Sequence, residues 1–474
     1  MISIIINEEF YQYDTYHITK AFYPNEEIQV EVKKDSKEIV KFHYNAQEIF
    51  RVEEETTGIL PSKEDSAGRK ECKHRMNIRL YEGLQKWTGK SLDWGILVGI
   101  RPTKIAMKKW KEFGNEIETI KWLEEYYRVS KEKATLALAI AKWENQLVSE
   151  LDSTDGYSLY IGIPFCKTRC TYCSFTAYPL KEWEHRIEEY LEALCKEIRF
   201  VSSVSNKKKL NTIYIGGGTP TSLTAMQMDK LLTCLKEEFS YVDLKEITVE
   251  AGRPDSITYE KLEVLRKHNI GRISINPQTM QEKTLRIIGR EHTVQDIYDV
   301  YYMARELGFD NINMDLIMGL PEETVEDVAD TLKAIERMHP DSLTVHSLAM
   351  KRASKMTISG ACVKEDSQMG QMIEMAAQSA ERMGLKPYYL YRQKNMAGNY
   401  ENVGYAEVDK AGIYNILIME EKQSVIAVGA GASTKIVLPR EKDNIIHIEN
   451  VKDVEGYITR IDEMIERKGE WLWH

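Results

Sequence analysis

The central part of the chain alternates short apolar runs with longer amphipathic stretches. The apolar runs have the length of buried strands, and the stretches between them carry apolar residues at helical spacing. The predicted strands are Tyr157–Ile163, Thr212–Ile215, Ile247–Ala251, Arg272–Asn276, Ile312–Met318 and Leu343–Ser347. The predicted helices include Arg186–Val201, Thr224–Phe239, Ser256–Lys267 and Thr324–Met338. Six β-α units in succession predict an α/β fold, in which a parallel sheet curves into an incomplete (β/α)6 barrel.

The pattern differs on either side of this repeat. Residues 1–55 predict strands, residues 65–150 predict helices, and a polar linker at 151–156 marks a boundary. The clearest of these elements are Ile2–Ile6, Ile28–Val32, Ile39–His43, Ile117–Tyr127 and Lys131–Val148. After residue 375, a Gly-rich apolar segment at Val425–Val437 precedes a closing helix predicted at Tyr457–Arg467. We therefore expect an N-terminal α+β region (1–150), a barrel core (151–375) and a C-terminal subdomain or lid (376–474).

Three cysteines follow the first strand of the repeat in a C-x3-C-x2-C pattern: Cys166, Cys170 and Cys173. A [4Fe–4S] cluster takes one thiolate per iron, so three thiolates leave one iron open. S-adenosylmethionine (SAM) can chelate an open iron, and an electron from the cluster then cleaves it to a 5′-deoxyadenosyl radical, chemistry that no side chain supplies. A structural zinc loop is the alternative. Zinc prefers paired C-x2-C knuckles or Cys2His2 spacing, and no second pair lies nearby.

Polar groups recur where the predicted strands end. The run Gly216-Gly217-Gly218-Thr219 follows the second strand, where glycines let backbone groups approach a ligand closely. Glu250 ends the third strand, Gln278 follows the fourth and Asp315 lies in the fifth. Arg290 could pair with a carboxylate as a planar fork. The alternatives are a tight turn, a structural polar network and a surface charge. In barrels of this kind the active site lies at the C-terminal ends of the strands, which places these groups and the cysteine loop on one face.

Composition is that of an ordinary soluble globular protein, with 43% hydrophobic and 29% charged residues among 474. A net charge of −10 argues against nucleic acid as the main partner. The N-terminus lacks a basic region and a cleavage site, and no apolar run approaches the length of a membrane span. Seven cysteines without a disulfide framework fit a reducing compartment, and Cys195 and Cys234 are interpreted as small core hydrophobes. We therefore expect a cytoplasmic protein without a membrane span.

Several motifs, in order along the chain, are similar to those of one known family. Their residues are Tyr160-x-x-Ile163-Pro164-Phe165-Cys166, Tyr172 before the third cysteine, Gly-Gly-Gly-Thr-Pro-Thr at 216–221, Val249-Glu250, Arg272-Ile273-Ser274 with Gln278, and Asn313-Met314-Asp315-Leu316-Ile317 with Gly319-Leu320-Pro321. Over about residues 155–350 the chain resembles the radical SAM superfamily and, within it, the oxygen-independent coproporphyrinogen III oxidase family. The long N-terminal region and Tyr388-Tyr389-Leu390-Tyr391-Arg392-Gln393-Lys394-Asn395 resemble its coproporphyrinogen dehydrogenase branch.

The resemblance implies a barrel of radical SAM type with a defined set of cofactor-binding residues. The three cysteines of the loop would bind the [4Fe–4S] cluster. SAM on the cluster would contact Tyr160, Tyr172, Gly217 and Glu250, with Gly216 beside them in the glycine run. A second SAM would contact Gly218, Thr219, Gln278, Arg290 and Asp315. The best-known members abstract a hydrogen from a propionate β-carbon. Loss of CO2 and an electron then gives a vinyl group, twice, converting coproporphyrinogen III to protoporphyrinogen IX in haem biosynthesis.

The resemblance also implies a tetrapyrrole substrate, a reductant such as flavodoxin or ferredoxin, and a monomer. The chain departs from the family at one position: authentic oxidases often carry a cysteine two residues after the third, and here that residue is Phe175. Relatives with phenylalanine there include haem-binding chaperones without oxidase activity. The alternatives to an oxidase are therefore a haem chaperone and another SAM-dependent enzyme that modifies a tetrapyrrole.

A porphyrinogen with four carboxylates would need cationic groups in its pocket, although the chain is acidic overall. The candidates are Arg101, Lys104, Lys351, Arg352, Arg392 and Lys394. The alternative for each is an ordinary surface charge. Arg101, Lys104 and Arg392 are the main candidates, because Arg101 and Arg392 lie in segments outside the barrel that could close over its mouth.

Overall fold

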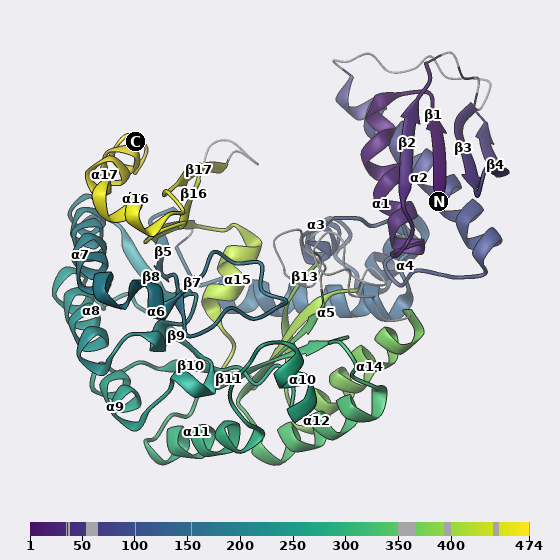
Figure 1. Ribbon diagram of the computed structural model, residues 1–474. Helices are drawn as coiled ribbons and strands as arrows, with labels where there is room; N and C mark the ends of the chain where they lie inside the picture. The colour runs from purple at the N-terminus through teal and green to yellow at the C-terminus, as the bar shows by residue number, and fades with distance from the viewer. Residues whose placement is uncertain are drawn as a thin grey trace.

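An open sheet of eleven strands forms the centre of the computed structural model (Figure 1). The structure describes residues 1–34, 36, 38–53, 65–99, 101–152, 154–348, 366–392, 400–438 and 445–473. The strand order is β13-β14-β12-β11-β10-β9-β8-β5-β15-β16-β17. The two outermost strands do not pair with each other, so the curved sheet is an incomplete barrel rather than a closed one.

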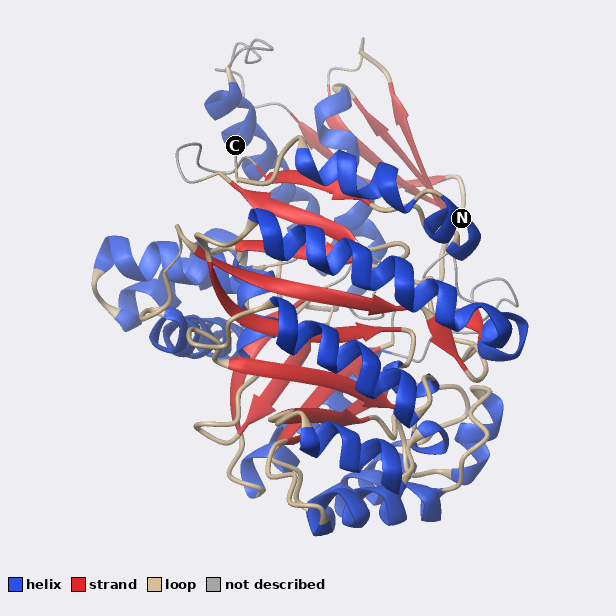
Figure 2. Ribbon diagram, turned by 90° about the vertical axis from the view of Figure 1, so that its left-hand side faces the viewer, coloured by secondary structure: helices blue, strands red, loops and turns tan. Residues whose placement is uncertain are grey.

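Six parallel strands in the middle of the sheet confirm the predicted β-α repeat. They are β5 (Gly156–Ile163), β8 (Lys209–Gly217), β9 (Glu246–Gly252), β10 (Arg272–Ile275), β11 (Ile312–Met318) and β12 (Ser342–Ser347). The longer helices that alternate with them are α7 (Ile187–Val204), α8 (Ala225–Glu238), α9 (Tyr259–Lys267), α11 (Val294–Glu306), α12 (Val325–Met338) and α14 (Asp366–Arg382). These helices cover the outer face of the curved sheet (Figures 1 and 2).

Local signals determine where these helices begin. Thr224 and Thr324 each start a helix through a capping box, in which the threonine and the residue three positions later exchange hydrogen bonds with the backbone. Helix α9 begins at Tyr259 rather than at the predicted Ser256, because the Thr258 side chain caps it. The amphipathic pattern alone does not resolve such differences of a few residues.

The first part of the chain builds a separate small sheet with its own hydrophobic core. Its strand order is β2-β1-β3-β4, and helices α1 and α2 pack beside it. The elements are β1 (Ile2–Ile6), α1 (Gln12–Phe22), β2 (Ile28–Val32), β3 (Glu38–Tyr44), β4 (Gln47–Glu53) and α2 (Ser66–Thr88). The sequence analysis did not predict α1 and β4. Their apolar residues are interrupted by polar ones, as in the half-exposed pattern of β4.

Buried residues of helices α3 (Pro102–Phe113), α4 (Glu116–Tyr127) and α5 (Lys131–Val148) belong to the hydrophobic core of the barrel, and Tyr127 of α4 packs against both cores. The change from one core to the other falls near Trp94, which is buried in the barrel core. The division at residue 150, drawn from the composition of the linker, stays a prediction.

The C-terminal part of the chain extends the sheet at both edges. Strands β13 (Lys386–Tyr391) and β14 (Asn402–Ala406) join next to β12, whereas β15 (Ser424–Val428) pairs in parallel with β5. The predicted Gly-rich segment is β15, a turn and β16 (Ser433–Val437). The remaining elements are α15 (Ile413–Glu420), β17 (Ile445–Glu449), α16 (Val454–Thr459) and α17 (Ile461–Gly469). The single closing helix predicted at Tyr457–Arg467 is therefore wrong in one respect: it is divided into α16 and α17 at Arg460.

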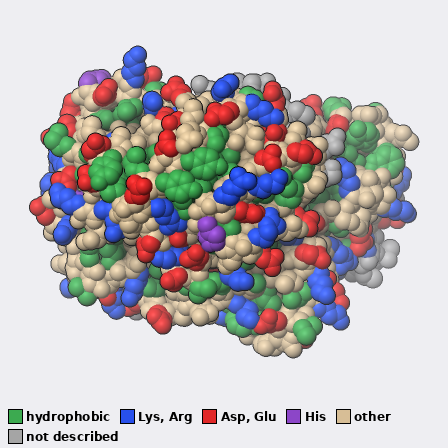
Figure 3. All heavy atoms as spheres, turned by 90° about the horizontal axis from the view of Figure 1, so that it is seen from below, with side chains coloured by type: hydrophobic (Ala, Val, Ile, Leu, Met, Phe, Trp, Pro, Cys, Tyr) green, Lys and Arg blue, Asp and Glu red, His purple; other side chains and the backbone are tan. Residues whose placement is uncertain are grey.

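Seen from below, the surface carries Lys and Arg side chains interspersed with Asp and Glu (Figure 3). Among the described residues, no helix is both long enough and apolar enough to span a membrane. These two observations agree with the composition of the chain.

Candidate active site

The cysteine loop begins directly after β5, where the sequence places it. Cys166 lies in the short strand β6 (Phe165–Cys166), which pairs with β7 (Tyr178–Pro179). The turn that follows is held by hydrogen bonds from the Cys173 backbone N–H to the Cys170 carbonyl (3.2 Å) and from the Thr171 N–H to the Ile288 carbonyl (3.0 Å). All three cysteines line one cavity of about 230 Å3 at the C-terminal ends of the strands.

The glycine run after β8 lies against the cysteine loop. The backbone N–H groups of Gly218 and Thr219 donate to the carbonyls of Ile163 and Phe165 at 2.8 Å. A Cβ at Gly218 would lie 2.6 Å from the Phe165 carbonyl oxygen, so no other residue fits without a shift. Gly217 has a φ of +109°, a conformation that side chains disfavour. These glycines therefore form a cradle beside the cysteines, and Thr219 Oγ1 lies 3.4 Å from Cys166 Sγ.

Three polar groups predicted at strand ends line this same cavity: Glu250, Gln278 and Asp315. Burial raises the pKa of Glu250 to about 7, although a hydrogen bond donated by the Tyr214 hydroxyl partly opposes this effect. Gln278 adopts a φ of +67°, and its buried side-chain oxygen has no hydrogen-bond partner in the part of the chain that the structure describes. An unpartnered buried amide oxygen in a left-handed residue is costly unless a ligand uses it. This orphaned acceptor fits a site built for a bound group.

Asp315 also faces a histidine that the sequence analysis missed. His346 Nε2 lies 3.8 Å from Asp315 Oδ2, and its Nδ1 lies 3.3 Å from the Tyr391 hydroxyl. Burial would raise the pKa of Asp315, but His346 and the hydrogen bonds from Asn313 and Thr344 together outweigh burial and lower it. Asp315 is therefore a half-buried carboxylate that holds its charge beside the cavity.

Arg290 lies beside the cysteine loop, as the resemblance implies. Its Nη2 donates to the Tyr172 hydroxyl at 3.1 Å, and its Nη1 donates to the Asn276 carbonyl. The Nε of Arg290 is buried without a partner. Arg290 and Tyr172 thus line the cavity together, with one guanidinium donor left for a ligand.

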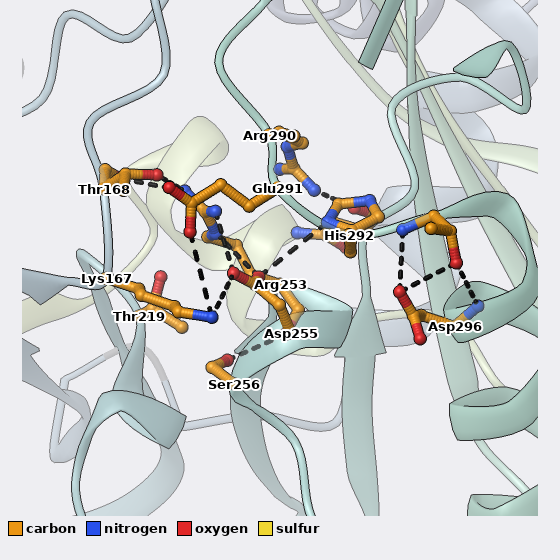
Figure 4. A network of polar contacts seen from close by, with 12 residues as sticks. Lys167, Thr168, Thr219, Arg253, Asp255, Ser256, Arg290, Glu291, His292 and Asp296 are labelled. Carbon is orange, nitrogen blue, oxygen red and sulfur yellow. Dashed lines mark hydrogen bonds and ion pairs between the residues drawn. The ribbon is translucent and has the colours of Figure 1, made fainter. Parts of the chain in front are cut away.

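A second arginine at this site was not predicted. Arg253 follows β9, is 3% exposed and pairs with Asp255 through two hydrogen bonds of 3.0 Å (Figure 4). Its Nη1 donates to the carbonyl and the hydroxyl of Thr168 at 2.8 Å and lies 3.8 Å from Cys170 Sγ. Arg253 therefore links the cysteine loop, through Thr168, to the segment that follows β9. Its place, a polar residue just after a strand end, is the signal that also identified Glu250.

A larger cavity of about 620 Å3 adjoins the first. Five tyrosines line it: Tyr160, Tyr214, Tyr389, Tyr391 and Tyr414. Tyr214 and Tyr414 stack with ring centroids 4.4 Å apart. The two cavities have lining residues in common: Ser174, Phe175, Gly217, Glu250, Asp315, His346 and Tyr391. A molecule in the larger cavity would therefore lie directly beside one bound at the cysteines.

The structure does not bring the three main cationic candidates to either cavity. Arg101 and Lys104 both pair with Glu421, Lys104 Nζ at 2.9 Å. Burial alone would raise the pKa of Glu421, but these two partners outweigh burial and hold it at about 2. Arg392 donates to the carbonyls of Leu97 and Gly99, and its guanidinium lies 5.2 Å from the centroid of the Trp94 ring. Lys351, Arg352 and Lys394 lie outside the described residues.

The loop fits an iron–sulfur cluster better than a zinc ion. Zinc requires several ligands to converge on one ion. Among the described residues, no three His, Cys, Asp or Glu side chains converge in this way. A [4Fe–4S] cluster needs no such convergence, because each thiolate binds a different iron. Burial raises the pKa of Cys166 to about 11, and the guanidinium groups of Arg253 and Arg290 beside the loop offset the negative charge that bound thiolates bring.

Comparisons with known proteins agree with this geometry. A family model described as the radical SAM superfamily matches residues 160–335. The oxygen-independent coproporphyrinogen-III oxidase-like protein HemZ of Bacillus subtilis is 42% identical over 426 residues, which cover 89% of this chain and 85% of that protein. The chain belongs to the radical SAM coproporphyrinogen oxidase family. Membership implies a [4Fe–4S] cluster and SAM as cofactors.

Other relatives of the family match over a shorter region. The heme chaperone HemW of Bacillus subtilis is 36% identical over 195 residues, 41% of this chain and 51% of that protein. The oxygen-independent coproporphyrinogen III oxidase of Escherichia coli K12 is 34% identical over 192 residues, 40% of this chain and 42% of that protein. The chain thus spans about half, or less, of these two family members.

A solved structure has the same fold as this chain. The coproporphyrinogen III oxidase HemN of Escherichia coli, described as a radical SAM enzyme, superposes with a TM-score of 0.54 at 24% identity. The superposition covers 67% of this chain and 72% of that chain. The incomplete barrel of radical SAM type predicted from the sequence is therefore confirmed.

Proposed function

We propose that this radical SAM oxidoreductase acts on coproporphyrinogen III and oxidatively decarboxylates two of its propionates to vinyl groups. The observation that carries the proposal is the junction of the two cavities. The larger, tyrosine-lined cavity opens onto the cavity of the cysteines through Gly217, Glu250 and Asp315. A flat, partly apolar substrate against tyrosine rings would lie within reach of a radical formed at the loop.

The groups that line the two cavities have roles in this proposal. Cys166, Cys170 and Cys173 hold the cluster, and Glu250, Gln278 and Arg290 hold SAM. The cluster and SAM, when bound, supply a reduction that produces a hydrogen-abstracting radical. The tyrosines exclude water from the substrate, and Gly217 lets the two ligands approach each other closely. Removal of one hydrogen atom from a propionate β-carbon and loss of CO2 leave a vinyl group. A reductant such as flavodoxin or ferredoxin supplies the electron for SAM cleavage, and the electron that remains after the loss of CO2 passes to a one-electron acceptor.

Anaerobic turnover tests the proposal. Reconstituted and reduced protein, incubated with SAM and coproporphyrinogen III, is expected to form 5′-deoxyadenosine and a tetrapyrrole that has lost two carboxyl groups, both measured by mass spectrometry. The control is the same protein without reductant. Cleavage of SAM with unchanged coproporphyrinogen, over a range of one-electron acceptors, would contradict the oxidase.

A haem chaperone is the second candidate, and Phe175 favours it. This side chain stands at the position of the family's further cysteine, is 66% exposed and lines both cavities. An exposed aromatic ring at a cavity mouth suits contact with a large apolar ligand. Stoichiometric haem binding, measured by a Soret shift, together with no conversion of coproporphyrinogen, would replace the oxidase with the chaperone.

The proposed role of Glu250 gives a prediction about pH. Because burial raises the pKa of Glu250 to about 7, the carboxyl is neutral below that pH and carries its charge above it. We expect the affinity for SAM to rise as pH increases through about 7, because the carboxylate then accepts a charged hydrogen bond from the amino group, and to fall again above about pH 8, where a free α-amino group loses its charge. Glu250→Gln should weaken SAM binding about tenfold at pH 8 and remove the rise with pH, because it loses a charged hydrogen bond.

Iron content distinguishes this role from a structural one. Glu250→Gln and Gln278→Ala should both keep full iron, since neither side chain belongs to the cysteine loop, and equilibrium dialysis with labelled SAM measures the affinity. Glu260→Gln, on the exposed side of α9, is the matched control and should change neither value. Loss of iron in both site variants would mean that these residues support the fold.

A further inference from the structure

The larger cavity contains one buried cation whose charge the described residues leave without a carboxylate. Arg272 lies at the start of β10, is 3% exposed and lines this cavity. Its Nη2 donates to the Ser342 hydroxyl at 3.2 Å, and its buried Nε has no hydrogen-bond partner among the described residues. Among the described residues, Arg272 forms no ion pair within 4.0 Å. Burying a guanidinium in this way is costly unless a ligand completes its contacts.

The other buried arginines near the barrel each contact at least two residues through hydrogen bonds. Arg253 pairs with Asp255, whereas Arg290 reaches a carbonyl and a phenol, and Arg392 reaches two carbonyls. Two acids, Glu246 and Glu250, act on Arg272 through their charges, and both also accept other hydrogen bonds. Glu246 accepts from the backbone N–H of Ile413 at 2.6 Å and from Thr248 Oγ1 at 3.0 Å, and Glu250 accepts from the Tyr214 hydroxyl. Arg272 therefore differs from these arginines in having one hydrogen bond, to Ser342, among the described residues.

The position of Arg272 defines an end of the cavity. In the sheet, Arg272 pairs in register with Thr248, two residues before Glu250 on β9. It therefore lies deeper in the barrel than Glu250, by about 7 Å along the strand. Arg272 lines only the larger cavity, and among the described residues that line this cavity it is the one Lys or Arg. The cation thus lies away from the cysteines, behind the tyrosines.

We infer that Arg272 binds a carboxylate of the substrate at the inner end of the larger cavity. This inference rests on the proposed function and names the group that orients the tetrapyrrole: one propionate is anchored by Arg272 while another faces the cofactor cavity. The planar guanidinium has an unused Nε beside Nη groups, the arrangement that holds a carboxylate through two hydrogen bonds. Glu250 and Asp315 at the opposite end repel a free carboxylate, so the charges of the cavity favour one orientation.

Paired ligands with and without carboxylates test this anchor. The probes are coproporphyrin III and its tetramethyl ester, titrated into the reconstituted protein and followed by the Soret band. Wild type is expected to bind the free acid more tightly than the ester. Arg272→Gln should reduce that preference about ten- to hundredfold, since a charged hydrogen bond is lost only for the acid. Arg272→Lys should retain part of it, because the charge remains and the planar fork does not.

Controls separate the anchor from damage to the fold. Arg305→Gln removes an arginine that pairs with Asp341 outside the cavity and should leave the preference unchanged. Iron content and SAM cleavage without substrate should be unaffected in the Arg272 variants. If Arg272→Gln does not fold, Arg272→Lys still decides, because an undiminished preference there contradicts the bidentate contact.

The outcomes also distinguish the anchor from the proposed function. An acid preference that survives in both Arg272 variants overturns the anchor and leaves the oxidase intact. Equal binding of acid and ester by wild type, with coproporphyrinogen still converted, likewise overturns the anchor alone. Failure of wild type to bind either probe or to convert coproporphyrinogen overturns both.

Discussion

Replacing Cys166, Cys170 or Cys173 by alanine is expected to abolish the iron–sulfur cluster, with iron per protein and the oxygen-sensitive visible absorbance falling to background. Three thiolates are the smallest protein ligand set for this cubane, and among the described residues no other cysteine lines the cavity. Loss of the cluster should also remove SAM cleavage, because the electron for that reaction comes through the cluster. Iron analysis and absorbance after anaerobic reconstitution measure the effect.

Two other cysteines are the matched controls for the loop. Cys195 and Cys234 lie in the neighbouring helices α7 and α8, are 4% and 6% exposed, and line a cavity between these helices. Cys195→Ala and Cys234→Ala should keep full iron and full SAM cleavage, since neither lines the cavity of the cluster. Full iron in any single variant of the loop would contradict the assignment of its three cysteines as ligands.

The barrel could be predicted from the sequence because the local spacing of apolar and polar residues indicates each of its strands and helices. Strand β11 has the predicted bounds, Ile312–Met318, because most of its residues are apolar and it lies between the polar pair Asp310-Asn311 and Gly319. Glu250, Gln278 and Asp315 could be grouped from the sequence alone, because the carboxyl ends of parallel strands meet at one edge of the sheet. The predicted topology therefore placed these three residues, which are far apart in the sequence, in one candidate site.

The cationic groups show what such patterns do not contain. Arg101 and Arg392 were plausible substrate contacts, yet the partners that engage them lie about 300 positions away in the chain, with separations of 320 and 295 residues. Arg272 lies at the start of its strand, where the rule about strand ends does not apply, and it reaches the cavity because the sheet curves. The identity of a charged residue's partner depends on tertiary packing, which no local period encodes.

The C-terminal part was the least predictable for the same reason. Its strands pair with β12, the strand before them in sequence, and with β5, the first strand of the barrel, so one part of the chain joins both ends of the β-α repeat. A Gly-rich apolar segment is compatible with a turn, a lid or a strand pair, and the pairing with β5 decides among them. Burial of Glu197 against this part is a further consequence that sequence patterns could not supply.

Removing the positive charge of Lys468 is expected to cause the largest loss of stability in the chain. Lys468 in α17 and Glu197 in α7 are both fully buried, and their charged atoms lie 2.7 Å apart. The Glu197 carboxylate also accepts hydrogen bonds from the Gly429 N–H at 2.9 Å and the Tyr457 hydroxyl at 2.6 Å. Lys468→Met would leave this carboxylate buried without its counter-charge, which costs about 3–5 kcal/mol.

A double variant and a surface control decide whether the buried pair is responsible. Glu197→Gln combined with Lys468→Met should be less destabilised than Lys468→Met alone, because no unpaired charge remains and the amide can still accept hydrogen bonds. Lys196→Met removes the exposed ion pair with Asp462 that links the same two helices, and we expect a change within about 0.5 kcal/mol. Urea unfolding gives the free energies, and amide exchange should rise first in α17 and in the Gly429 turn. Equal losses in Lys468→Met and Lys196→Met would show that the contact of the two helices, and not the buried charge pair, holds the C-terminal part to the barrel.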